Sequence, residues 1–147
     1  MTATLRPIEI LLVDDSPGDV RLTLESFKDS LIANTIHCVN DGVEALEYLR
    51  DIPNRDGTEY PDLILLDLDM PNMDGRELLS IIKQDDNLKQ IPVIVLTISP
   101  SDQDILTAYG LHANSYITKP VELDDFVGVL RAFEGFWLSV VKLPRRS

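Results

Sequence analysis

The sequence has little cysteine and no long apolar run. Cys38 is the only cysteine among 147 residues, which excludes an internal disulfide and a cysteine-based metal cluster within one chain. A membrane-spanning helix needs about 18 consecutive apolar residues, and no stretch approaches that length. Residues 1–9 hold one arginine and lack the apolar segment of a secretion signal. We therefore expect a cytoplasmic protein.

Basic residues are also scarce. Lysine and arginine total 13 against 25 acidic residues, so the formal net charge is −12. Phosphate backbones and anionic lipids repel a chain this acidic, so we expect no binding to nucleic acid or membranes. A metal cation or a basic surface on a protein partner is a better candidate ligand. The length and the 44% hydrophobic content predict one domain with a substantial core.

Short apolar runs alternate with amphipathic stretches. Ile8–Val13, Leu63–Leu66 and residues 91–96 are almost wholly apolar, which is typical of strands buried on both faces of a parallel sheet. Weaker strand candidates are residues 35–39 and 113–117. The helical patterns begin near Ser16, Asp41, Asp74, Ser99 or Ser101, and Glu122, and the last reaches Val140. Five β-α units predict an α/β fold with a parallel sheet.

Polar side chains follow four of the predicted strands. Asp14 and Asp15 end the first strand, Asp67 the third, Thr97 the fourth, and Lys119 lies just past the fifth. Ligands bind at the carboxyl ends of parallel strands, so these side chains should gather at one edge of the sheet. Three neighbouring carboxylates need a cation to stay ionised together. All-oxygen ligation by few protein groups suits Mg²⁺.

This set of groups predicts phosphoryl chemistry. A phosphoryl group is commonly held by a metal ion, a lysine and a hydroxyl that surround an oxygen nucleophile. Asp14 and Asp15 are paired, which suits metal binding, whereas Asp67 stands alone at the end of the most central-looking strand. We therefore predict that Asp67 becomes an acyl phosphate.

Four motifs in order resemble the receiver domain of bacterial two-component response regulators. They are Asp14-Asp15, the run LLDLDMPNMDG over residues 65–75, Leu96-Thr97, and YITKP over residues 116–120. The resemblance covers about residues 7–135. It implies a flavodoxin-like (βα)5 fold with strand order 2-1-3-4-5 and an extended C-terminal helix. It also implies one receiver domain over residues 1–147, with a C-terminal extension at 136–147 and no output domain.

The resemblance assigns roles to the acidic residues. Asp67 would accept a phosphoryl group from a histidine of a sensor kinase. Asp15 would bind Mg²⁺ directly and Asp14 would assist, directly or through water. Asp69 would offer its backbone carbonyl to the metal, and Asp67 would complete the metal site.

The other motifs receive roles in the same way. Lys119 would contact the phosphoryl oxygens, and Thr97 and Tyr116 would form a switch pair. The Lys119–Pro120 peptide bond would be cis, although only about 5–6% of bonds before proline are cis.

An internal segment and the C-terminal region both depart from a minimal receiver. A longer insertion near residues 52–59 and the aromatic run near Trp137 are similar to the response regulators that partner cyanobacterial phytochromes, which implies a phytochrome-type kinase. The last helix also carries more apolar surface than one sheet can cover, and aromatic residues are enriched at interfaces. We expect a homodimer through the fourth helix, fifth strand and fifth helix. Its predicted contact residues are Phe126, Phe133, Phe136 and Trp137.

Alternative interpretations remain at this stage. Asp67-Leu-Asp69 is similar to the Asp-x-Asp motif of haloacid-dehalogenase-like phosphatases, although that family carries it on the first strand. A pseudo-receiver that binds partners without phosphorylation is a second alternative. Asp14-Asp15 could be a helix cap, and Tyr116 could be a core residue. A nucleotide-binding module is excluded, because no Gly-x-Gly pair or Gly-Lys-Ser/Thr motif occurs.

Overall fold

The computed structural model describes residues 7–28, 33–55, 60–68, 70, 73–98, 101–120, 122–133 and 135–136. Its centre is a five-stranded parallel sheet in the order β2-β1-β3-β4-β5. The strands are β1 (Ile8–Val13), β2 (Asn34–Val39), β3 (Leu63–Leu66), β4 (Val93–Thr97) and β5 (Ser115–Thr118). The predicted fold class and strand order are confirmed.

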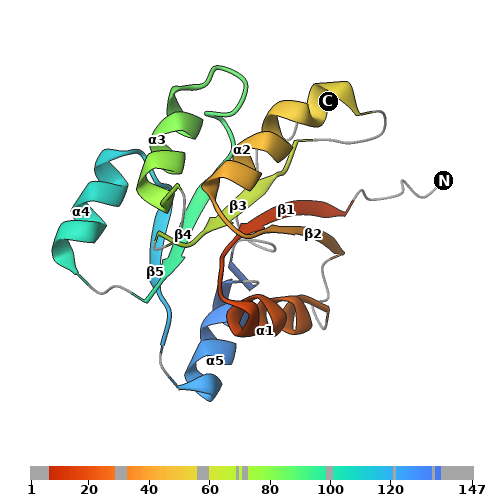
Figure 1. The fold of residues 1–147 in the computed structure, drawn as a ribbon. Coiled ribbons are helices and arrows are strands. Elements are labelled where there is room, and N and C mark those ends of the chain that lie inside the picture. The colour runs from red at the N-terminus through yellow and green to blue at the C-terminus, as the bar shows by residue number, and fades with distance from the viewer. Residues whose placement is uncertain are drawn as a thin grey trace.

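The helices cover both faces of the sheet. They are α1 (Pro17–Lys28), α2 (Gly42–Asp51), α3 (Gly75–Gln84), α4 (Asp102–Gly110) and α5 (Leu123–Phe133), with a 3-10 turn, η1 (Ile52–Asn54), after α2. Helices α1 and α5 lie on one face, and α2, α3 and α4 lie on the other (Figure 1). The described helices are too short and too polar to span a bilayer.

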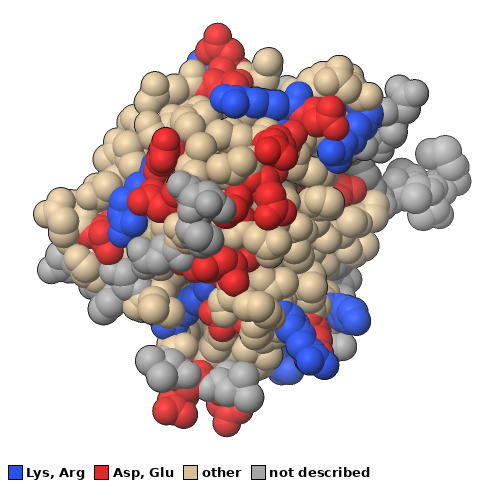
Figure 2. Space-filling model, in the orientation of Figure 1, with Lys and Arg blue, Asp and Glu red and all other residues tan. Residues whose placement is uncertain are grey.

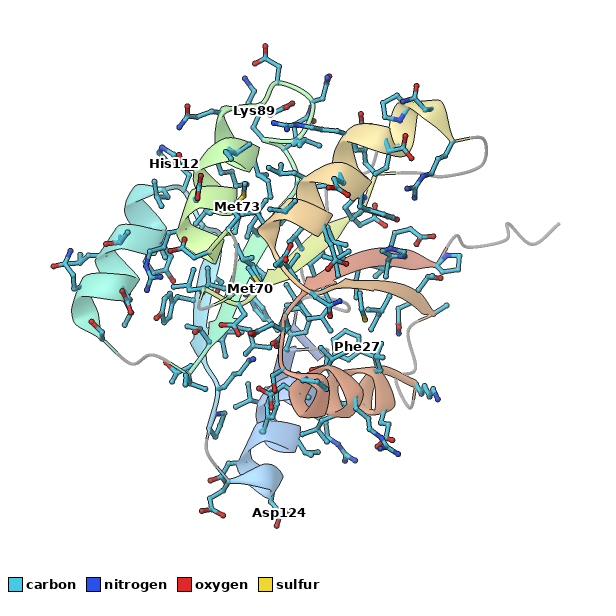
Figure 3. All side chains as sticks on the ribbon, in the orientation of Figure 1. Phe27, Met70, Met73, Lys89, His112 and Asp124 are labelled. Atoms are coloured by element: carbon cyan, nitrogen blue, oxygen red, sulfur yellow. The ribbon has the colours of Figure 1, made fainter. Side chains whose placement is uncertain are left out.

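The apolar runs form the three inner strands. All four side chains of β3 and all five of β4 are buried, and β1 is buried except at Glu9. Full burial of one aliphatic side chain contributes roughly 1.5–3 kcal/mol, so these strands hold the layers together. Phe27 points from α1 toward the sheet (Figure 3) and stacks on Phe133 of α5 at 5.8 Å between ring centroids. The core therefore fixes α1 against α5.

The predicted helix starts are confirmed at their capping residues. The Asp41 side chain accepts a hydrogen bond from the Glu44 amide, and Asp74 accepts from the amides of Arg76 and Glu77. Ser101 rather than Ser99 caps α4, because its hydroxyl accepts from the Asp104 amide. These bonds satisfy backbone amides that a helix leaves unpaired in its first turn.

The boundaries of the last elements differ from the prediction. Strand β5 begins at Ser115 rather than 113, because the Ala113 amide donates to Ala108 and closes α4. His112 makes this reversal at a φ of 72°. Helix α5 ends at Phe133, and residues 135–136 form a π-helical turn. The helix was predicted to continue to Val140, and residues 134 and 137–140 of that prediction lie outside the described residues.

Candidate functional site

Three carboxylates meet where β1 and β3 end. The two strands are adjacent, with Val13 opposite Leu66, so the residues that follow them come together. One carboxylate oxygen from each of Asp14, Asp15 and Asp67 lies within 4.8 Å of the others. We call these residues the acid triad. Asp14 and Asp67 are buried and Asp15 is exposed, so the triad opens to solvent on one side.

The donor set of the acid triad fits a hard divalent cation. Carboxylates this close repel one another, and a cation between them removes that repulsion. Three oxygen donors with an open side suit Mg²⁺, which keeps several of its waters. Acidic side chains lie near the middle of the face in Figure 2, between α1 and α3. Asp69, the fourth predicted metal residue, lies outside the described residues.

Lys119 is buried beside the acid triad, as predicted. Its side chain is 3% exposed, and its Nζ lies 2.6 Å from Asp14 Oδ2 and 3.7 Å from Asp67 Oδ2. Burial lowers the pKa of Lys119. Hydrogen bonding to Asp14, the charges of Asp14 and Asp67, and a hydrogen bond to Asp19 together outweigh burial and raise the pKa above the ordinary lysine value. The side chain is therefore an ammonium that faces the predicted nucleophile.

Asp19 is a site residue that the sequence analysis missed. Its Oδ2 lies 3.0 Å from Lys119 Nζ, although the two residues are 100 positions apart. It lies in the first turn of α1. An acidic residue there is commonly explained by its attraction to the positive end of the helix dipole. A usable signal was present, since Ser16-Pro17 starts the helix at once and keeps its first turn close to the acid pair.

Thr97 ends β4 beside the acid triad, and its hydroxyl has no hydrogen-bond partner among the described residues. The residue is fully buried, and its Oγ1 makes no hydrogen bond in the described structure. A buried unpaired hydroxyl costs about 1–3 kcal/mol, so its retention here is consistent with a group that acquires a partner. Tyr116 lies on β5 opposite Val95 and packs, partly buried, against the core under α2, α3 and α4.

The loop after Asp67 is held by a close backbone approach. The Gly75 amide donates to the Leu68 carbonyl oxygen at 2.8 Å. A Cβ atom added at Gly75 would lie 2.3 Å from the Asp67 carbonyl oxygen. A Cβ atom added at Gly42, at the start of α2, would lie 2.8 Å from Cγ of Met73, which is labelled in Figure 3. Glycine at position 75 therefore allows α3 to begin directly against the backbone of the nucleophile.

The Lys119–Pro120 peptide bond is trans. The expectation of a cis Lys119–Pro120 bond was wrong, because the described residues contain no cis peptide bond. The trans form before proline is intrinsically favoured by about 0.5–1 kcal/mol. The Lys119 amide still donates to the Thr97 carbonyl oxygen at 2.7 Å. The lysine therefore reaches the site with a trans bond.

The residues predicted for a dimer interface occupy different environments. Phe126 and Phe133 are 4% and 5% exposed, so their rings belong to the core of their own chain. Phe136 is 53% exposed, and Trp137 lies outside the described residues. Phe136 therefore exposes apolar surface, whereas the two buried rings hold α5 in place.

Comparison with known proteins gives concordant matches. The model of the response regulator receiver domain matches residues 10–131. Response regulator Rcp1 of Synechocystis sp. is 44% identical over 138 residues, which are 94% of each chain. The solved structure of the Mn²⁺-bound form of Rcp1 has a TM-score of 0.89 and 43% identity, and covers 95% of this chain and 100% of its own. The phosphorylated cyanobacterial phytochrome response regulator RcpA gives the same values.

Proposed function

The chain belongs to the response regulator receiver domain family, and from this premise we propose that it receives a phosphoryl group on Asp67 in a Mg²⁺-dependent reaction. One observation carries the proposal: the Lys119 ammonium lies 3.7 Å from Asp67 Oδ2 beside three clustered carboxylates. This arrangement places positive charge next to the oxygen that would attack phosphorus. Electrostatic stabilisation and positioning supply most of the catalysis in phosphoryl transfer.

The proposed reaction is an in-line displacement. An Asp67 carboxylate oxygen forms a bond to phosphorus while the P–N bond of a donor phosphohistidine breaks. The ring nitrogen keeps the electron pair of that bond, and because the other ring nitrogen of the donor carries a proton, the histidine leaves as a neutral imidazole. Bound Mg²⁺ would supply positive charge to the phosphoryl oxygens from its place on Asp14, Asp15 and Asp67. Lys119 would donate a hydrogen bond to one of those oxygens.

Phosphorylation would then bias a switch at the end of β4. The phosphoryl group brings three acceptor oxygens, and the buried Thr97 hydroxyl has no partner in the described structure. We expect this hydroxyl to turn toward the phosphoryl group. Tyr116, which lies partly buried on the neighbouring strand, would repack in response. The surface formed by α4, β5 and α5 would change its affinity for partners.

The proposed phosphoryl donor is a phytochrome-type sensor histidine kinase in the cytoplasm. Support comes from the match to a protein described as a phosphorylated cyanobacterial phytochrome response regulator. We also propose a homodimer through α4, β5 and α5. Its support is the apolar surface left exposed by Leu106, Tyr109 and Phe136.

The test is phosphorylation of the purified chain with acetyl phosphate and Mg²⁺. Intact-mass spectrometry is expected to detect one added phosphoryl group, located on Asp67 and removed by hydroxylamine. Asp67→Asn should abolish the addition. Asp74→Asn is a matched control in the same loop, because asparagine also caps a helix, and it should keep the label. Undiminished labelling of Asp67→Asn would contradict the assignment.

A further inference from the structure

We propose that Asp19 is a positioning residue for Lys119, which holds the ammonium when a divalent ion occupies the acid triad. Three carboxylates contact Lys119 Nζ: Asp14 at 2.6 Å, Asp19 at 3.0 Å and Asp67 at 3.7 Å. Asp14 and Asp67 belong to the acid triad, whereas Asp19 does not. Asp19 is therefore the one of these three partners that lies outside the proposed metal site.

The ammonium and the metal compete for the same carboxylate. Lys119 makes its shortest contact, 2.6 Å, with Asp14. A divalent ion bound by the acid triad would attract the Asp14 carboxylate and so weaken the contact between Asp14 and Lys119. The side chain of Lys119 is 3% exposed, so water cannot readily replace the lost partner, and an unpaired buried charge is costly. Asp19 would supply the remaining anionic partner and lower the cost of metal binding.

The local structure of α1 holds Asp19 in place for this task. The Asp19 amide donates to the Ser16 hydroxyl at 3.4 Å, and its carbonyl oxygen accepts from the buried Thr23 hydroxyl at 2.8 Å. Helix α1 is in turn fixed by the stacking of Phe27 on Phe133 of α5. The Asp19 side chain is 33% exposed, so water reaches the carboxylate that contacts Lys119.

Asp19 would also aim the ammonium. An ammonium has three N–H donors, and hydrogen bonds to Asp14 and Asp19 use two of them. The third donor is then available to an acceptor bonded to Asp67, whose Oδ2 lies 3.7 Å away. This part of the inference rests on the proposed phosphoryl transfer. The effect on metal binding does not.

The first test measures Mn²⁺ affinity without any phosphoryl donor, by the electron paramagnetic resonance signal of the free ion. Asp19→Asn is expected to weaken Mn²⁺ binding about fivefold, a typical coupling between two sites. Glu25→Gln is the matched control, because it removes the same charge from α1 at a side chain that is 60% exposed and pairs with Arg21. This control should change the affinity less than about twofold, since exposed charges are screened.

A double-mutant cycle with Lys119→Met separates positioning from direct attraction of the ion. If Asp19 acts through Lys119, Asp19→Asn in the Lys119→Met background should have no more effect than Glu25→Gln. An equal loss in both backgrounds would overturn the proposal, because Asp19 would then attract the ion directly. No loss in the wild-type background would also overturn it. Asp19→Ser gives the same comparison if the asparagine variant is unstable in a thermal melt.

The second test uses acetyl phosphate at saturating Mg²⁺. Asp19→Asn should lower the maximal rate of phosphorylation about tenfold, as loss of a supporting hydrogen bond at a metal site often does, and leave the donor concentration for half-maximal rate unchanged. Asp19→Glu should restore most of the rate. An unchanged maximal rate would overturn this role. Absence of any phosphorylation in the wild type would refute the proposed function instead, and the Mn²⁺ cycle would still decide the role of Asp19.

Discussion

The backbone amide of Lys119 donates a hydrogen bond of 2.7 Å to the carbonyl oxygen of Thr97. This bond extends the pairing of β4 with β5 by one residue beyond Thr118. The bond therefore joins the backbone of the residue that carries the ammonium to the backbone of the residue that carries the buried hydroxyl. A movement of either residue in response to phosphorylation would be transmitted to the other.

Thr97→Val should raise the stability of the unphosphorylated protein by about 1 kcal/mol, because it removes a buried hydroxyl that has no partner in the part of the chain that the structure describes. Chemical denaturation measures this change. Thr23→Val is the matched control, since the buried Thr23 hydroxyl donates to Asp19 at 2.8 Å. The control should lose about 1 kcal/mol. A loss of stability in Thr97→Val comparable to that of the control would show that the Thr97 hydroxyl is satisfied.

Gly75→Ala should destabilise the protein by about 2 kcal/mol or more, because the new Cβ would lie 2.3 Å from the Asp67 carbonyl oxygen and the backbone must shift. Phosphorylation of Asp67 should slow as well. Gly128→Ala on α5 is the control, because a Cβ there meets no atom of the described residues within 4 Å, apart from its own helix. Better helix propensity should stabilise that variant by up to about 1 kcal/mol. Equal thermal midpoints for the two variants would contradict the close approach.

Mg²⁺ should stabilise the folded chain. An ion that binds only the native state at about 100 times its dissociation constant adds about 2.7 kcal/mol to the free energy of unfolding. Denaturation in MgCl₂ and in EDTA, with NaCl at matched ionic strength, measures the difference. Asp15→Asn should remove most of it without disturbing the core, because Asp15 is the exposed member of the acid triad. Full stabilisation of Asp15→Asn by Mg²⁺ would place the ion elsewhere.

Lys83→Met should cost about 2 kcal/mol at pH 7, because Lys83 Nζ donates to the carbonyl oxygens of Lys89 and Ile91 and to Asn114 Oδ1. Lys89→Met, which alters a side chain 54% exposed, should be nearly neutral. Denaturation of both variants measures these costs.

The cost of Lys83→Met should also depend on pH. Burial lowers the pKa of Lys83 from its ordinary value of 10.5. At pH values between the lowered pKa of Lys83 in the folded protein and 10.5, the unfolded chain binds more protons than the folded chain. The contribution of Lys83 to the free energy of unfolding therefore increases as pH rises through this interval. The deficit of Lys83→Met relative to the wild type should therefore grow toward pH 10.5. A deficit that shrinks over the same interval would contradict the buried, hydrogen-bonded lysine.

Phe136→Ser should weaken self-association about tenfold, because loss of one aromatic contact at an interface commonly costs more than 1 kcal/mol. Sedimentation velocity over a concentration series measures the change. Val43→Ser is the control: Val43 is 40% exposed on α2, which lies on the other face of the sheet. An identical sedimentation profile for the wild type and Phe136→Ser would remove Phe136 from the interface.

The local sequence pattern was sufficient to predict most of the residues of the site. Apolar runs that end in acids identify strands buried on both faces, and parallel strands bring their carboxyl ends to one edge, so Asp14, Asp15 and Asp67 could be placed together before any coordinates. Lys119 was predicted to join them because it lies just past the end of the fifth predicted strand. The strand ends alone did not point to Asp19, because an acid in the first turn of a helix is also explained by attraction to the positive helix end.

The amino-acid sequence by itself determined the order of the elements, the edge of the sheet that carries the chemistry, and the charge that gathers there, because periodicity and strand direction are properties of short segments. Tertiary packing decided which side chains are covered and which atoms touch. It buried Phe126 and Phe133 in the core of their own chain and brought Asp19 to within 3.0 Å of Lys119. These outcomes depend on how one helix lies against another, and that arrangement is settled by contacts between residues far apart in the chain.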